Sequence, residues 1–119
     1  MSTRNQKYAI SAYKQVEQVS QDFPKQKSKY KSMCEKLPIL IRTAGLTQAL
    51  AFVEAKAVDE PAWKNLLKHL TKTLERPTLV ADSRNVELGE YMRLTRDVLS
   101  VLLWYKRFAQ SLLADKPSD

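Results

Sequence analysis

The chain has 119 residues, 20 basic and 13 acidic side chains with a formal net charge of +7, one cysteine and one histidine. One cysteine cannot form an internal disulfide, and with one histidine it cannot complete a tetrahedral zinc site. The apolar runs are much shorter than the roughly 20 residues of a spanning helix, and no signal-peptide pattern opens the chain. We therefore expect one cytoplasmic domain over residues 1–119, without metal or membrane segment.

The basic excess lies in the first two thirds of the chain. Residues 1–36 hold eight basic and three acidic side chains, residues 37–76 hold six and four, and residues 77–119 hold six of each. A concentration of positive charge favours a polyanionic partner, although solubility alone also explains a modest basic excess.

Helical spacing dominates the first half of the sequence. Apolar residues recur every three or four positions over Arg4–Asp22, which predicts a helix that Pro24 ends. A second helix is expected from Ser28 towards Leu37, where Pro38 either kinks it or begins a new segment. Only two glycines occur, and no alternating pattern typical of strands is present.

The middle of the chain continues this pattern. Gly45 suits the left-handed residue that closes a helix, and helical spacing resumes over Leu46–Lys56. Asp59 is expected to cap a further helix that ends before Pro77. Residues 77–87 are expected to be a connector with room for a short helical turn.

The last helix is expected to begin at Val86 or Leu88 and to reach Leu113. Its middle is apolar nearly all round, which is typical of the central element of a bundle. The sequence thus predicts an all-α fold, a compact single-domain bundle of about five to six helices with a long central C-terminal helix. A tail of about residues 115–119 is expected to fray.

Arg42 stands in an otherwise almost wholly apolar run and has no acid within four positions. A buried arginine without a partner is costly, so we expect its head to reach towards solvent or an anionic ligand.

Lys64, Lys68, Lys72 and Arg76 lie four apart along one predicted helix, which places neighbouring charges about 6 Å apart along the axis. Such a row of cations can follow a polynucleotide backbone with little sequence preference. An ordinary solvated face, moderated by Glu60 and Glu75, explains the pattern about equally well.

Lys106 and Arg107 also lack an acid within four positions. From the pattern alone, basic residues near a helix C-terminus are more often partners of the helix dipole than of a ligand.

No catalytic constellation is present. The sequence has no phosphate-binding glycine loop, metal-ligand cluster or paired carboxylates, and His69 and Cys34 lack suitable neighbours. Trp63 and Trp104 stand on apolar helix stripes, as do Tyr91, Tyr105 and Phe108, so core packing is the favoured interpretation over base stacking. We expect no enzyme and no cofactor.

Several short sequence motifs occur in a specific order. Leu-Pro-Ile-Leu-Ile-Arg-Thr-Ala-Gly-Leu-Thr-Gln-Ala-Leu-Ala-Phe spans residues 37–52, a tryptophan-led helix follows at Trp63, and Glu-Tyr-Met-Arg-Leu-Thr precedes Trp-Tyr-Lys-Arg-Phe-Ala. With these motifs the chain resembles, from Tyr8 to Ala109, the small all-helical subunit of the type III-B (Cmr) CRISPR effector complex.

The resemblance implies an architectural subunit of an RNA-guided antiviral assembly, in which copies stack in a minor filament beside the filament holding guide RNA. It implies other complex subunits, neighbouring copies, guide RNA and target RNA as partners, and it leaves RNA cleavage to other proteins. The resulting candidates for RNA contact are Arg42, Lys64, Lys68, Lys72, Lys106 and Arg107.

Two alternatives remain at this stage. A helical adaptor that binds only proteins would need no row of cations and would associate with little sensitivity to salt. A helix-turn-helix DNA reader is disfavoured because residues 46–53 offer only Thr47 and Gln48 to base edges.

Overall fold

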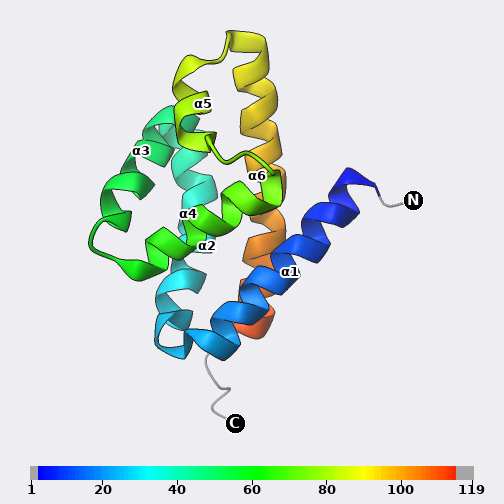
Figure 1. The fold of residues 1–119 in the computed structure, drawn as a ribbon, viewed down its shortest axis with the longest axis vertical. Coiled ribbons are helices and arrows are strands. Elements are labelled where there is room, and N and C mark those ends of the chain that lie inside the picture. The colour runs from blue at the N-terminus through cyan, green and yellow to red at the C-terminus, as the bar shows by residue number, and fades with distance from the viewer. Residues whose placement is uncertain (1–2, 115–119) are drawn as a thin grey trace.

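The computed structural model describes residues 3–114, which fold into six α-helices and one short 3-10 helix with no strand (Figure 1). This confirms the predicted all-α class, and the expected frayed tail lies outside the described residues. The elements in chain order are α1 (Arg4–Asp22), η1 (Pro24–Gln26), α2 (Lys27–Ala44), α3 (Leu46–Ala57), α4 (Pro61–Leu74), α5 (Leu79–Asn85) and α6 (Leu88–Leu112).

Helix α1 has the bounds that the sequence predicts. The Thr3 hydroxyl accepts a hydrogen bond from the Gln6 backbone N–H at 3.1 Å, and the Gln6 side-chain oxygen accepts one from the Thr3 N–H at 2.7 Å. This reciprocal pair satisfies two donors that the start of a helix leaves free. Pro24 follows α1 and opens η1, where its missing N–H is tolerated.

Helix α2 runs through Pro38, so no new segment begins there. Proline removes one backbone hydrogen bond from a helix interior. The neighbouring side chains Leu37 and Ile41 are only 1% and 2% exposed, and their burial offsets the loss. The helix ends at Ala44, and the next residue, Gly45, has a φ of +89°, a positive value as predicted for this residue.

Helix α4 begins one residue later than expected. Glu60, rather than Asp59, holds the N-cap position, and its side chain makes no cap hydrogen bond. The Glu60 carboxylate instead lies 2.8 Å from the Lys29 ammonium. Pro61 then takes the first helical position, which its fixed φ favours. In the connector, α5 is a helix of seven residues rather than a single turn.

Helix α6 packs against α1, α2 and α4. In Figure 1, α1 and α4 cross in front of α6, and α2 lies behind α4. Leu94, Val98 and Leu102 are at most 1% exposed along the packed side, whereas Leu103 on the outer side is 45% exposed. The long C-terminal helix therefore joins the other helices, as predicted, while one of its sides stays at the surface.

A buried chain of hydrogen bonds fixes the rotation of α4. The His69 ring nitrogen Nδ1 lies 2.7 Å from the Tyr30 hydroxyl of α2, and the Tyr105 hydroxyl of α6 donates to the His69 carbonyl at 3.0 Å. The Thr73 hydroxyl is 2.6 Å from the Tyr105 hydroxyl and 2.7 Å from the Ser11 hydroxyl of α1. These bonds hold α4 to three helices, and α3 also packs against it, so the rotation of α4 about its axis is fixed.

Candidate nucleic-acid interface

Three of the predicted contact residues lie together on the outward face of α4. Lys64, Lys68 and Lys72 are all at the surface, whereas Leu66 and Leu70 between them are fully buried. Within residues 3–114, no acid lies within 4.0 Å of these three ammonium groups. Their charges are therefore available to an external anion. We call these three residues the lysine row.

Arg76 does not extend the lysine row, contrary to its sequence spacing. Helix α4 ends at Leu74, and Glu75 adopts a left-handed backbone with φ of 54°, which breaks the helical register. The Arg76 guanidinium then lies 2.8 Å from the Asp82 carboxylate and 4.0 Å from that of Glu90. These two ion pairs thus link Arg76 to Asp82 of α5 and to Glu90 in the first turn of α6.

Two residues of the lysine row affect the pKa of His69, which lies in the core. His69 lies on the buried side of α4 and is 4% exposed. Burial lowers the pKa of His69 to about 4, and the charges of Lys68 and Lys72 contribute to this shift. The imidazole is therefore neutral at physiological pH, in keeping with a core residue rather than a titrating catalyst.

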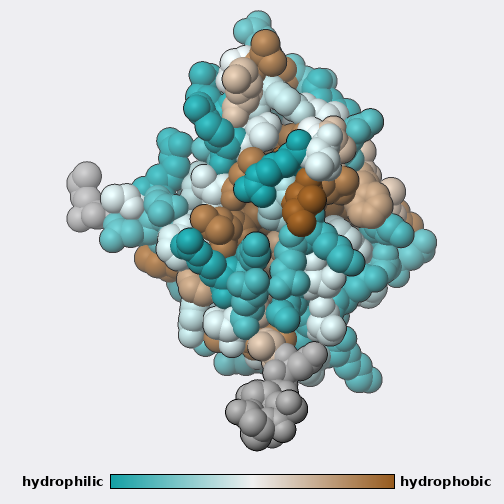
Figure 2. Space-filling model, turned by 180° about the vertical axis from the view of Figure 1, so that it is seen from behind, coloured by the Kyte–Doolittle hydropathy of each residue, from teal (hydrophilic) through white to brown (hydrophobic). Residues whose placement is uncertain are grey.

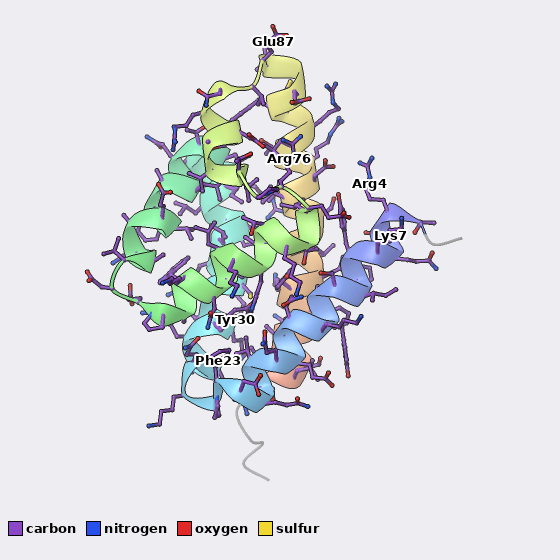
Figure 3. All side chains as sticks on the ribbon, viewed as in Figure 1. Arg4, Lys7, Phe23, Tyr30, Arg76 and Glu87 are labelled. Carbon is purple, nitrogen blue, oxygen red and sulfur yellow. The ribbon has the colours of Figure 1, made fainter. Side chains whose placement is uncertain are left out.

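Two basic residues that sequence reasoning missed lie beside the end of the lysine row. Arg4 and Lys7 from the start of α1 line a shallow hollow of about 260 Å³ with Thr73, Leu74 and Glu75. Figure 3 shows both basic side chains at the N-terminal end of α1. The net charge of residues 1–36 was the one available signal, since nothing in the sequence places α1 beside α4.

Arg42 lies in the last turn of α2 and is exposed, as expected from its isolation among apolar residues. It stands close to the corner at Gly45, which the hydroxyl of Tyr91 supports by accepting a hydrogen bond from the Thr47 N–H at 3.2 Å. No described acid lies within 4.0 Å of the Arg42 guanidinium.

Lys106 and Arg107 lie on α6, directly after the buried Tyr105. Tyr105 is the residue of α6 that bonds to α4, and Arg107 follows it by two positions, or about 200° around the helix. The Arg107 guanidinium lies 5.4 Å from the centre of the Trp104 ring. The six predicted residues thus come from three helices, and the three residues of the lysine row share one helix face.

The aromatic residues mostly pack in the core, as the sequence predicts. Tyr105 is fully buried and Trp63 is 7% exposed. Trp104 and Phe108 are half-buried and stack on each other with ring centres 5.7 Å apart, and the Trp104 indole N–H donates to Asn5 at 2.9 Å. Packing and hydrogen bonding within the chain thus account for the placement of these rings.

The described part of the chain offers few groups for chemistry. No set of three potential metal ligands gathers within it. Cys34 is fully buried, and burial raises the pKa of its thiol well above the usual range. None of the described helices has the length and apolar character needed to cross a bilayer.

Comparisons with known proteins agree on one family. A family model described as CRISPR-associated protein (Cas_Cmr5) matches residues 4–112. The chain is 40% identical over 118 residues to the CRISPR system Cmr subunit Cmr5 of Thermus thermophilus, covering 97% of this chain and all of the relative. A crystal structure of a CRISPR-associated Cmr5 family protein from Thermus thermophilus superimposes with a TM-score of 0.87 at 42% identity, covering 94% of this chain and 98% of the other.

Proposed function

Since the chain belongs to the Cmr5 family and is a small subunit of the type III-B Cmr CRISPR complex, we propose that its copies stack in a minor filament and contact target RNA through basic residues. In this role the chain acts in the cytoplasm as one non-catalytic domain. Its partners are other Cmr subunits, neighbouring copies, and target RNA paired with guide RNA.

The lysine row is the observation that carries the RNA contact. Its three ammonium groups are at the surface, free of described acids and spaced four residues apart on a helix that the buried hydrogen bonds hold in place. Regularly spaced, unpaired cations neutralise phosphates and release counterions, which supplies affinity without base recognition. Lys7 adds a cation on α1 at the hollow beside residues 73–75, whereas Arg4 lies 3.6 Å from the Asp97 carboxylate.

The remaining candidate RNA contacts lie on helices other than α4, and stacking of copies in a filament would give them a part in RNA binding. Arg42 lies on α2, and Lys106 and Arg107 lie on α6, so these candidates do not share the helix face that carries the lysine row. Neighbouring copies in a filament would bring different faces of successive subunits to one path. Binding by the lone subunit would then be weak, and binding in the assembly would be strengthened by multivalency.

The same distribution over three helices is also what the alternative would show, a helical adaptor that binds only protein partners and makes no RNA contact. In that case the outlying basic residues would meet acidic surfaces of other subunits or solvent. The two functions predict different contacts for each cation in the assembled complex. In the first the cation meets an RNA phosphate, and in the second it meets a protein surface or solvent.

We expect a test on reconstituted complexes to distinguish them. Complexes that carry Lys68→Ala, Arg42→Ala or Lys106→Ala are compared with wild type for target-RNA retention over a range of salt concentrations. Each true phosphate contact that is lost should reduce the slope of log affinity against log salt by about 0.7 to 0.9. Lys25→Ala, which changes an exposed lysine of η1, is the matched control and should leave the slope unchanged.

Unchanged slope and retention in all three variants, with the complex intact, would establish the adaptor role instead.

The non-catalytic role has its own test. We expect the purified chain to cleave neither RNA nor DNA with any divalent metal, because its described residues include no acid cluster to hold one. Metal-dependent cleavage that a single substitution in this chain abolishes would contradict it.

A further inference from the structure

An apolar groove lies on a part of the surface that the RNA-contact proposal does not use. It runs between α2, α3 and the start of α4 and has a volume of about 440 Å³. Its apolar lining includes Ile39 and Leu40 of α2, Phe52 of α3 and Trp63 of α4. Figure 2, which views the molecule from behind relative to Figure 1, shows apolar residues over the middle of that face.

The groove exposes apolar side chains that the fold itself does not need. Ile39 is 60% exposed and Phe52 is 43% exposed, although both stand beside buried residues. The Phe52 and Trp63 rings meet edge to face with centres 5.6 Å apart, which gives the groove a rigid wall. Exposed aliphatic and aromatic groups around a preformed hollow are typical of a protein-binding surface.

The rim of the groove is positively charged. Lys29, Lys36 and Lys56 line it together with Glu60. The Glu60 carboxylate pairs with the Lys29 ammonium at 2.8 Å, and this hydrogen bond lowers the pKa of Glu60. Lys36 and Lys56 have no acid within 4.0 Å among the described residues, so the rim keeps an excess of positive charge.

These features favour a protein segment over an RNA strand. A base needs an open ring face on which to stack. Trp63 is only 7% exposed, and the Phe52 ring carries the Lys56 ammonium 5.6 Å from its centre. The most exposed apolar group is the aliphatic Ile39, which matches an apolar side chain better than a base.

We propose that this groove docks an acidic segment of another protein subunit of the complex, with apolar side chains filling the hollow and carboxylates meeting Lys36 and Lys56. The proposal rests on the assembly part of the proposed function, since it requires the chain to work inside a multi-subunit complex. It does not depend on RNA contact by the lysine row. The hydrophobic contacts provide affinity, and the lysines select for an acidic partner.

Photo-crosslinking in the reconstituted complex tests the identity of the occupant. Ile39 is replaced by p-benzoylphenylalanine, and the crosslinked peptide is identified by mass spectrometry. The control places the same group at Met92, which is 57% exposed on α6 and lies outside the groove. We expect the Ile39 probe, unlike the Met92 probe, to capture a segment of another subunit that combines apolar residues with Asp or Glu.

Incorporation of variant subunits tests the energetics. Ile39→Asp places a charge in the groove and should weaken incorporation into the complex by about tenfold or more, whereas Met92→Asp should have little effect. The double variant Lys36→Glu with Lys56→Glu should also weaken incorporation, most strongly at low salt. Ile39 is already exposed, so its substitution should leave the thermal unfolding midpoint near that of wild type.

Crosslinks to RNA, to a second copy of this chain or to a segment without acidic residues would each overturn the proposal. Wild-type incorporation of both groove variants would overturn it as well. Failure here is distinguishable from failure of the RNA-contact proposal, because the salt slope of target-RNA retention is read from Lys68→Ala and not from the groove variants.

Discussion

The buried His69 makes stability depend on pH in a way that can be calculated. Burial and the neighbouring lysines lower its pKa to about 4 in the folded chain, whereas an unfolded histidine has a pKa of about 6.5. Between these values the unfolded state binds the proton more readily, so the free energy of unfolding falls as the pH falls. From pH 7 to pH 5 the expected loss is about 2 kcal/mol, within a limit of about 3 kcal/mol at lower pH.

Urea unfolding at pH 7 and pH 5 measures this loss, and His69→Gln provides the reference. Glutamine retains a hydrogen-bonding group for Tyr30 but does not titrate, so its free energy of unfolding should change much less over this interval. His69 is the single histidine of the chain, so its ring protons can be followed by NMR without ambiguity. A titration midpoint near pH 6.5, or equal losses in the two proteins, would refute the reasoning.

Three further predictions concern packing and backbone geometry. Leu102→Ala should lower the free energy of unfolding by about 2 to 5 kcal/mol in urea titrations because Leu102 is fully buried, and Leu103→Ala on the outer side of the same helix should cost clearly less. Gly45→Ala should destabilise by about 1 to 2 kcal/mol, since it forces a side chain onto a φ of +89° with the Tyr91 hydroxyl oxygen 3.4 Å from the new Cβ. Gly89→Ala should instead raise the melting temperature, because Gly89 lies in α6 with nothing within 4 Å of an added Cβ. Equal effects at the two glycines would contradict this explanation.

Local chemistry made much of the fold predictable. Helical spacing with Pro24 sets the bounds of α1, and the need for a positive φ identifies Gly45 as the corner between α2 and α3. The course of the chain at Pro38 could not be predicted in the same way. Whether a helix continues through a proline depends on the packing around it rather than on the proline itself. The displaced cap of α4 has a similar cause, since Glu60 pairs with Lys29, which is distant in sequence.

The candidate site was predictable only within one helix. Periodicity places Lys64, Lys68 and Lys72 on one face because all three share α4. Their relation to Lys7 depends on how α1 crosses α4, and the diversion of Arg76 depends on the left-handed turn after Leu74. The groove beside Ile39 was also hidden, because exposed apolar residues have the same sequence pattern as core residues.

The burial of Cys34 makes this chain a convenient subject for chemical labelling. Its thiol is inaccessible and its pKa is raised, so maleimide reagents will not modify the native protein until it opens. A single cysteine introduced on the surface can therefore carry a fluorophore without first removing the natural one. The rate at which Cys34 itself becomes modified reports the population of the open form when reclosing is faster than labelling, from the same sample and without denaturant.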